Sequence, residues 1–90
     1  MHKRIWVDIV AEMVEAAKEP IGKTALMYKL SFSGEMFKHY IILAKNNGVL
    51  EYDPECRRYR TTEKGREYLN VYHKLNQLIT NKEISDYIIG

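Results

Sequence analysis

The sequence is poor in the residues that metal sites, phosphate loops and disulfides need. Its single cysteine, Cys56, cannot form a disulfide within the chain, whereas a secreted domain of this size usually carries several cysteines. We therefore expect a protein of the reducing cytoplasm. The three histidines (His2, His39 and His73) stand far apart, and one cysteine leaves no zinc-ligand spacing. No glycine-rich loop follows an expected strand. We expect no enzyme, no metal and no cofactor.

Long apolar runs are also missing. No run approaches the roughly 20 residues that cross a membrane, and Asp8 and Glu12 interrupt the basic and apolar N-terminal segment, which argues against a signal peptide. The 90 residues, 46% hydrophobic and 29% charged, suit one small globular domain over residues 1–79 with a terminal helix or tail over 80–90. A net charge of +2 favours polyanions only mildly.

Helical periodicity predicts two helices in the first third of the chain. Residues 3–17 carry an apolar stripe and end before Pro20, because the residue before a proline resists the helical region. The stripe consists of Ile5, Trp6, Ile9, Val10, Met13, Ala16 and Ala17. A shorter helix is expected over 24–30, with Leu26, Met27 and Leu30 facing inward, and Phe32 is expected to plug the core beneath the following turn.

The stretch from Ser33 to Gly48 is expected to be the central helix. Ser33 is a good N-cap, and Gly48 suits the left-handed position after a helix end. The inner face is formed by Phe37, Tyr40, Ile41 and Ala44. The residues left outside are Gly34, Glu35, Lys38, His39, Ile42 and Lys45.

After Gly48 the pattern changes to that of a β-hairpin. Strands are expected over 49–52 and 57–61, joined by the turn-forming residues 53–56. Thr62 then caps a last helix. Its apolar positions form a short coiled-coil-like seam that fails after Ile79, and Thr80 with Glu83 is a possible capping box for a separate short helix.

Three segments carry a family resemblance: KTALMYKLSFS (23–33), KNNGVLEYD (45–53) and RRYRTTEKGREYL (57–69). Over about residues 5–78 the chain resembles the small archaeal winged helix-turn-helix proteins. The resemblance implies a mainly helical α+β domain, with three helices, a hairpin and a fourth helix, that binds double-stranded DNA. Some such proteins are dimers joined through a long last helix, and some of those are chromatin proteins. This sequence departs from the long coiled-coil form because its seam fails after Ile79.

The residues expected to contact DNA lie on the second and third helices and on the hairpin. They are Lys23, Thr24, Lys29, Ser33, Gly34, Glu35, Lys38, His39, Lys45, Arg57, Arg58 and Arg60. Several alternatives stay open. His39 is equally well explained as a solvated surface residue, Tyr28 as a contact or a packing residue, and the arginines as one side of a cross-strand salt-bridge ladder with the acidic residues of the hairpin.

The last helix and the tail supply the expected dimer contacts. These are Tyr68, Tyr72, Leu75, Ile79, Ile84, Tyr87 and Ile88, although the tail residues fold back onto the same subunit in the second alternative. Two functions are compatible with these observations. One is a homodimeric DNA-binding regulator or nucleoid protein, and the other is a protein-interaction module on the same scaffold without DNA binding.

Overall fold

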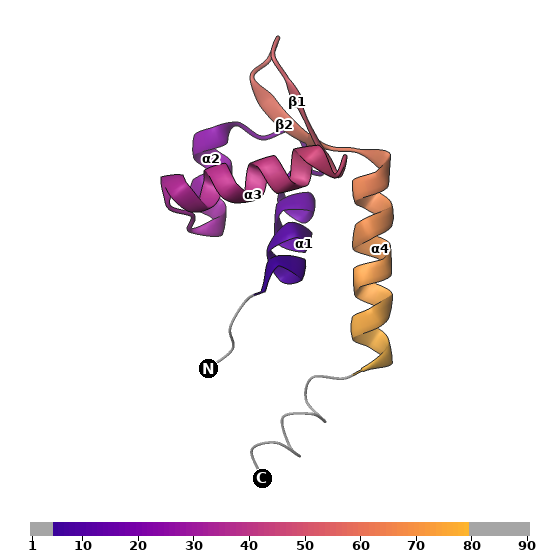
Figure 1. The fold of residues 1–90 in the computed structure, drawn as a ribbon. Helices are drawn as coiled ribbons and strands as arrows, with labels where there is room; N and C mark the ends of the chain where they lie inside the picture. Colours follow the sequence, from indigo (N-terminus) through magenta and orange to yellow (C-terminus); the bar gives the residue numbers. More distant parts are fainter. Residues whose placement is uncertain (1–4, 80–90) are drawn as a thin grey trace.

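The computed structural model describes residues 5–79, which form four helices and one antiparallel hairpin (Figure 1). The elements are α1 (Trp6–Ala16), α2 (Lys23–Leu30), α3 (Gly34–Asn46), β1 (Leu50–Asp53), β2 (Arg58–Thr61) and α4 (Glu63–Leu78). This order confirms the expected fold class. The possible capping box and terminal helix, with Ile84, Tyr87 and Ile88, lie outside the described residues.

Helix α1 is the centre of the core. It packs against α2, α3, α4 and β2, and Met13 and Val14 are completely buried. The expected apolar stripe is wrong at its beginning, because Ile5 and Trp6 are each 57% exposed. Ile5 is the N-cap of α1, and both side chains border a groove instead of lying beneath a covering element. Periodicity gives the face of a helix but not how far along it the neighbouring elements extend.

A tight turn connects α2 to α3. Ser31 adopts a left-handed conformation (φ 57°) that ends α2, and the buried Phe32 then closes the core, which confirms its predicted role as a plug. The side chain of Ser33 accepts a hydrogen bond from the backbone N–H of Met36 at 3.1 Å and so caps α3. Figure 1 shows that α3 then crosses in front of α1.

The hairpin follows a left-handed Gly48 (φ 72°) and pairs Tyr52 with Tyr59 in its register. The second strand begins one residue later than expected, because Arg57 is left-handed (φ 55°) and belongs to the turn. Ile21 extends the sheet: it exchanges two backbone hydrogen bonds with Tyr59, at 3.0 and 2.7 Å. The hairpin is thereby fixed to the segment between α1 and α2.

Helix α4 begins at a close approach between two backbones. Thr62 caps it by accepting from the N–H of Gly65 at 3.0 Å, and a Cβ on Gly65 would lie 2.3 Å from the Val49 carbonyl oxygen. Only glycine allows this approach. The helix then runs beside α1, to which the hydroxyl of Tyr68 donates a hydrogen bond at the Val7 carbonyl oxygen, at 2.6 Å (Figure 1).

Candidate nucleic-acid interface

One face of α3 is buried and the opposite face is exposed along its whole length. Phe37, Ile41 and Ala44 are buried, and Tyr40 is half-buried. The six residues predicted to lie outside are all exposed: Gly34, Glu35, Lys38, His39, Ile42 and Lys45. The expected division of this helix is therefore confirmed, and its outer face is available to a large partner.

Two lysines of this face lie on the flank nearest the hairpin. Lys38 and Lys45 are seven positions apart, which places them on one side of the helix about 10 Å apart along its axis. The Lys45 ammonium lies 5.9 Å from the centre of the Tyr52 ring on β1. Helix and hairpin thus meet at a cation–aromatic contact. Tyr52 is 38% exposed and lies beside this surface, although its position in the sequence did not predict such a contact.

The contacts expected from α2 divide between two sides of the molecule. The Lys23 ammonium lies 5.6 Å from the centre of the Phe37 ring, close to α3. Thr24 and Tyr28 lie beside the turn between α2 and α3. Tyr28 is 87% exposed, so the alternative that it packs in the core is wrong. Lys29 instead borders the end of α1 beside Glu15. The structure therefore separates Lys29 from the other α2 residues.

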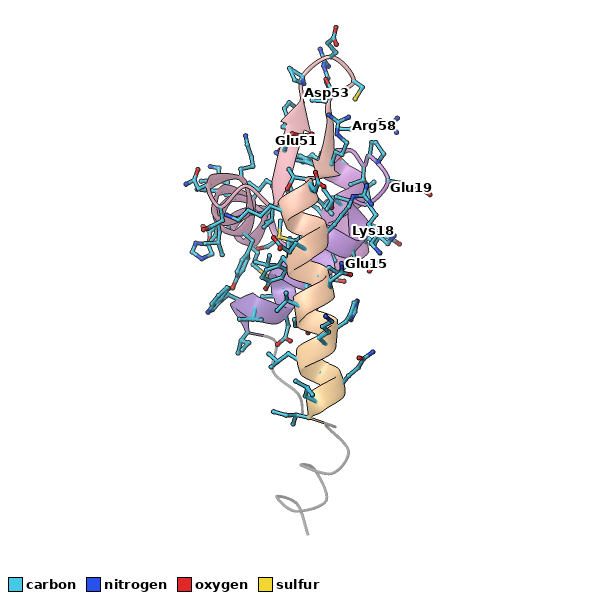
Figure 2. All side chains as sticks on the ribbon, turned by 90° about the vertical axis from the view of Figure 1, so that its right-hand side faces the viewer. Glu15, Lys18, Glu19, Glu51, Asp53 and Arg58 are labelled. Atoms are coloured by element: carbon cyan, nitrogen blue, oxygen red, sulfur yellow. The ribbon has the colours of Figure 1, made fainter. Side chains whose placement is uncertain are left out.

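The hairpin presents its aromatic face, not its charged face, to α3. The Tyr59 ring lies 5.7 Å from that of Phe37 and 4.8 Å from that of Tyr52, so this face packs on the helix. Arg58 and Arg60 alternate with Tyr59 and therefore point to the opposite side. Figure 2 shows Arg58 on the same side as Lys18, away from α3.

Salt bridging accounts for one arginine of the hairpin. Arg60 donates from Nε to Glu51 Oε2 at 3.0 Å, which confirms the cross-strand alternative for this residue. Arg58 is opposite Asp53 in the register, yet within residues 5–79 no carboxylate pairs with it. Arg57 occupies the exposed tip. The tip is ordered by Asp53, whose Oδ1 accepts from the N–H of Glu55 at 2.9 Å, and this hydrogen bond lowers the pKa of Asp53.

The positions at the start of α3 differ in what they can still contact. The hydroxyl of Ser33 is occupied in capping, whereas Gly34 is exposed with open space around it. Glu35 projects from the first turn and adds a negative charge to the face. His39 lies on the flank away from Lys38, with its ring 4.8 Å from that of Tyr40. The helix thus combines two cations, one anion and one histidine.

The seam proposed for dimerisation divides where α4 passes the first turn of α1. Tyr68 and Tyr72 are half-buried on α1, where the Tyr72 hydroxyl donates to Asp8 Oδ1 at 2.5 Å. Burial raises the pKa of Tyr68, and the hydrogen bond to Asp8 raises the pKa of Tyr72. Leu75 and Ile79 are 54% and 50% exposed. Only the second half of the seam is uncovered in the single chain.

Residues 5–79 contain neither a membrane-spanning helix nor a cluster of metal ligands. No helix there is both long and apolar enough to cross a membrane. In the same part of the chain no group of three or more His, Cys, Asp or Glu side chains is arranged to hold a metal ion.

Comparison with known proteins gives the family. A search of the curated proteins found no match to this chain. A family model described as winged helix-turn-helix matches residues 3–80. That range includes every helix and strand that the structure describes, among them two helices joined by a short turn and the hairpin that follows them. The chain therefore belongs to this winged helix-turn-helix family.

Proposed function

We propose that this protein binds double-stranded DNA through the exposed face of α3, as a transcriptional regulator or a nucleoid-associated protein. One observation carries the proposal. In a winged helix-turn-helix chain, the second helix of the motif is uncovered along its outer side, and Lys38 and Lys45 lie on that side. A helix exposed in this way fits the major groove of DNA.

The residues of α3 suggest how the groove is read. Lys38 and Lys45 are placed to neutralise phosphates, and Gly34 leaves the first backbone N–H groups accessible to another phosphate. Glu35 is able to accept a hydrogen bond from a cytosine amine but repels the backbone. The helix has no arginine, so the commonest specific contact, arginine to guanine, is missing. We infer that sequence preference is modest or depends on DNA shape.

The hairpin is proposed to act as a secondary contact through its tip. Arg57 is the exposed tip residue, whereas Arg58 and Arg60 lie on the face directed away from α3. The tip therefore has the better position for a backbone or minor-groove contact beside the helix. Arg58 contributes to binding where DNA wraps onto that outer face, whereas Arg60 is already paired with Glu51.

The functional unit is proposed to be a homodimer joined through α4. Four apolar side chains of its second half and its C-cap are half or more exposed: Val71, Leu75, Leu78 and Ile79. A small domain that exposes such a group gains from burying it against a second copy. Two copies of α3 about 34 Å apart on one face would then read two half-sites.

Titration with duplex DNA at several salt concentrations tests the proposal. Phosphate neutralisation releases counterions, so the affinity should fall steeply and linearly on a log–log plot against salt. A flat salt dependence, or no complex at low salt, would contradict it.

A protein-interaction module on the same scaffold is the second candidate. The net charge of +2 is low for a nucleic-acid-binding protein, and the apolar side of α4 suits a protein partner. A partner protein that stays bound after nuclease treatment, together with the absence of a DNA complex at low salt, would favour this candidate.

A further inference from the structure

A groove of about 890 Å³ lies on the flank of α3 opposite Lys38 and Lys45. Three elements wall it: Tyr40 and Leu43 come from α3, Trp6 from the start of α1, and Tyr68 from α4. Small-molecule sites in proteins are hollows of roughly 300–1,000 Å³ with mainly apolar and aromatic walls. The groove has the size and the lining of such a site.

The charge of the groove has one sign. Among the described residues that line it, Lys64 is the only one with a formal charge, and neither Asp nor Glu is present. The stem of Lys64 runs past Gly48, where a Cβ would lie 3.8 Å from its Cδ. Within residues 5–79 no carboxylate pairs with the Lys64 ammonium. An unpaired cation at the edge of an apolar hollow complements a ligand with an apolar body and an anionic end.

Trp6 is the aromatic apolar side chain of the groove with the largest exposed fraction. Its side chain is 57% exposed, as is that of the adjacent Ile5. Covering an indole of this size with an apolar group is favourable because it removes apolar surface from water. The groove therefore offers both a charge to pair and an aromatic surface to bury.

We propose that this groove binds a small carboxylate with an apolar body, of the size of a medium-chain fatty acid. The carboxylate pairs with Lys64, and the apolar body lies against Trp6 and Leu43. A hollow between three elements suits a compact molecule of this kind better than it suits the side of another helix.

The site is adjacent to the proposed DNA contacts, because His39 both lines the groove and lies on the exposed side of α3. This step rests on the proposed function. A ligand that reaches His39 overlaps with bound DNA only at that edge of the exposed side, so we expect octanoate to weaken DNA binding by a small factor and, reciprocally, DNA to weaken octanoate binding by the same factor.

Fluorescence of the 90-residue chain without DNA tests the site directly, since Trp6 is its one tryptophan. Octanoate is titrated against 1-octanol, which has the same apolar chain without the charge. We expect a saturable shift of the Trp6 emission to shorter wavelength, with tighter binding of octanoate than of octanol. Lys64→Met should weaken octanoate binding a few-fold, as expected for the loss of an exposed ion pair. It should leave octanol binding unchanged.

Lys74→Met is the matched control, because Lys74 is exposed on α4 and does not line the groove. Four results would overturn the proposal: no saturable shift, equal affinity for octanoate and octanol, equal effects of the two lysine variants, or a shift that follows protein concentration without ligand. The last result would mean that a second copy covers Trp6. Because these titrations contain no DNA, a failure of DNA binding would leave their outcome unaffected.

Discussion

The Nε atom of Arg60 lies 3.0 Å from Glu51 Oε2, and this ion pair joins the two strands on the side of the hairpin away from α3. Both side chains are about half exposed, so the pair is expected to contribute only about 0.2–1 kcal/mol to the free energy of unfolding. Its main effect is to occupy Arg60, which the sequence analysis predicted to contact DNA.

The hairpin arginines should therefore differ in their effect on DNA binding. Arg57→Gln removes a charge from the exposed tip, and Arg60→Gln removes one that is already paired. We expect the first substitution to lower the affinity for duplex DNA several-fold and the second to lower it by less than a factor of two. Because both variants change the net charge equally, each is the control for the other. A larger loss in Arg60→Gln would show that the outer face of the hairpin meets DNA.

Gly65→Ala should destabilise the domain strongly. The added Cβ would lie 2.3 Å from the Val49 carbonyl oxygen, so α4 and the start of the hairpin must move apart. We expect a loss of about 3 kcal/mol or more in the free energy of unfolding, measured by chemical denaturation. Gly34→Ala is the control, because open space surrounds Gly34 in the first turn of α3. It should be neutral or stabilising. Similar losses in both variants would contradict the close approach.

Stability should fall in alkaline solution through the tyrosines that join α4 to α1. The hydrogen bond to Asp8 raises the folded-state pKa of Tyr72, and burial raises that of Tyr68, both above the ordinary tyrosine value of about 10. A raised pKa means that the stabilisation is complete below the unfolded pKa and is lost as pH rises through the folded pKa. We expect the denaturation midpoint to fall as the pH rises above about 10, the ordinary pKa of tyrosine.

Tyr72→Phe provides the comparison for this pH effect. Phenylalanine keeps the ring but cannot ionise, so the variant should be less stable near neutral pH and lose less of its stability on going to high pH. The loss near neutrality reflects Asp8, which accepts from the hydroxyl at 2.5 Å. A variant with the same pH profile as the native chain would show that Tyr72 does not carry the effect.

Self-association should depend on the uncovered half of α4. Leu75→Gln together with Ile79→Gln removes two apolar side chains that are 54% and 50% exposed. We expect the native chain to sediment as a dimer and this double variant as a monomer, because the variant lacks the apolar surface on α4 whose burial drives pairing. Ile42→Gln is the control, since Ile42 is 56% exposed on α3. Dimers of undiminished stability in the double variant would refute the α4 interface.

Local signals predicted the elements and the turn chemistry well. The cap at Ser33, the left-handed Gly48, the plug at Phe32 and the cap at Thr62 all depend on a few neighbouring residues, and the structure confirms them. Element ends were less accurate. The second strand begins at Arg58 because a left-handed residue closes the turn, a choice of backbone conformation that alternation does not reveal.

The exposed side of α3 was predictable because the apolar residues of this helix recur on its opposite face. The direction of the hairpin was not. Alternation shows that Arg58 and Arg60 share a face, but the contact of Tyr59 with Phe37 decides which face turns away from α3. Likewise, nothing local indicated that Trp6 would border a groove, because that depends on where α3 and α4 cross the start of α1.

The most direct test of the account compares two double variants in duplex DNA titrations over a range of salt concentrations. Lys38→Gln with Lys45→Gln removes two charges from the exposed side of α3. Lys18→Gln with Lys74→Gln removes two exposed charges elsewhere, with Lys18 on the side away from α3 (Figure 2). If α3 contacts the phosphates, the first variant should bind roughly tenfold or more weakly, and its log–log salt slope should be shallower by about 1.8. The second variant should retain nearly native affinity and slope. Equal losses in the two variants, or no loss in the first, would contradict binding through α3.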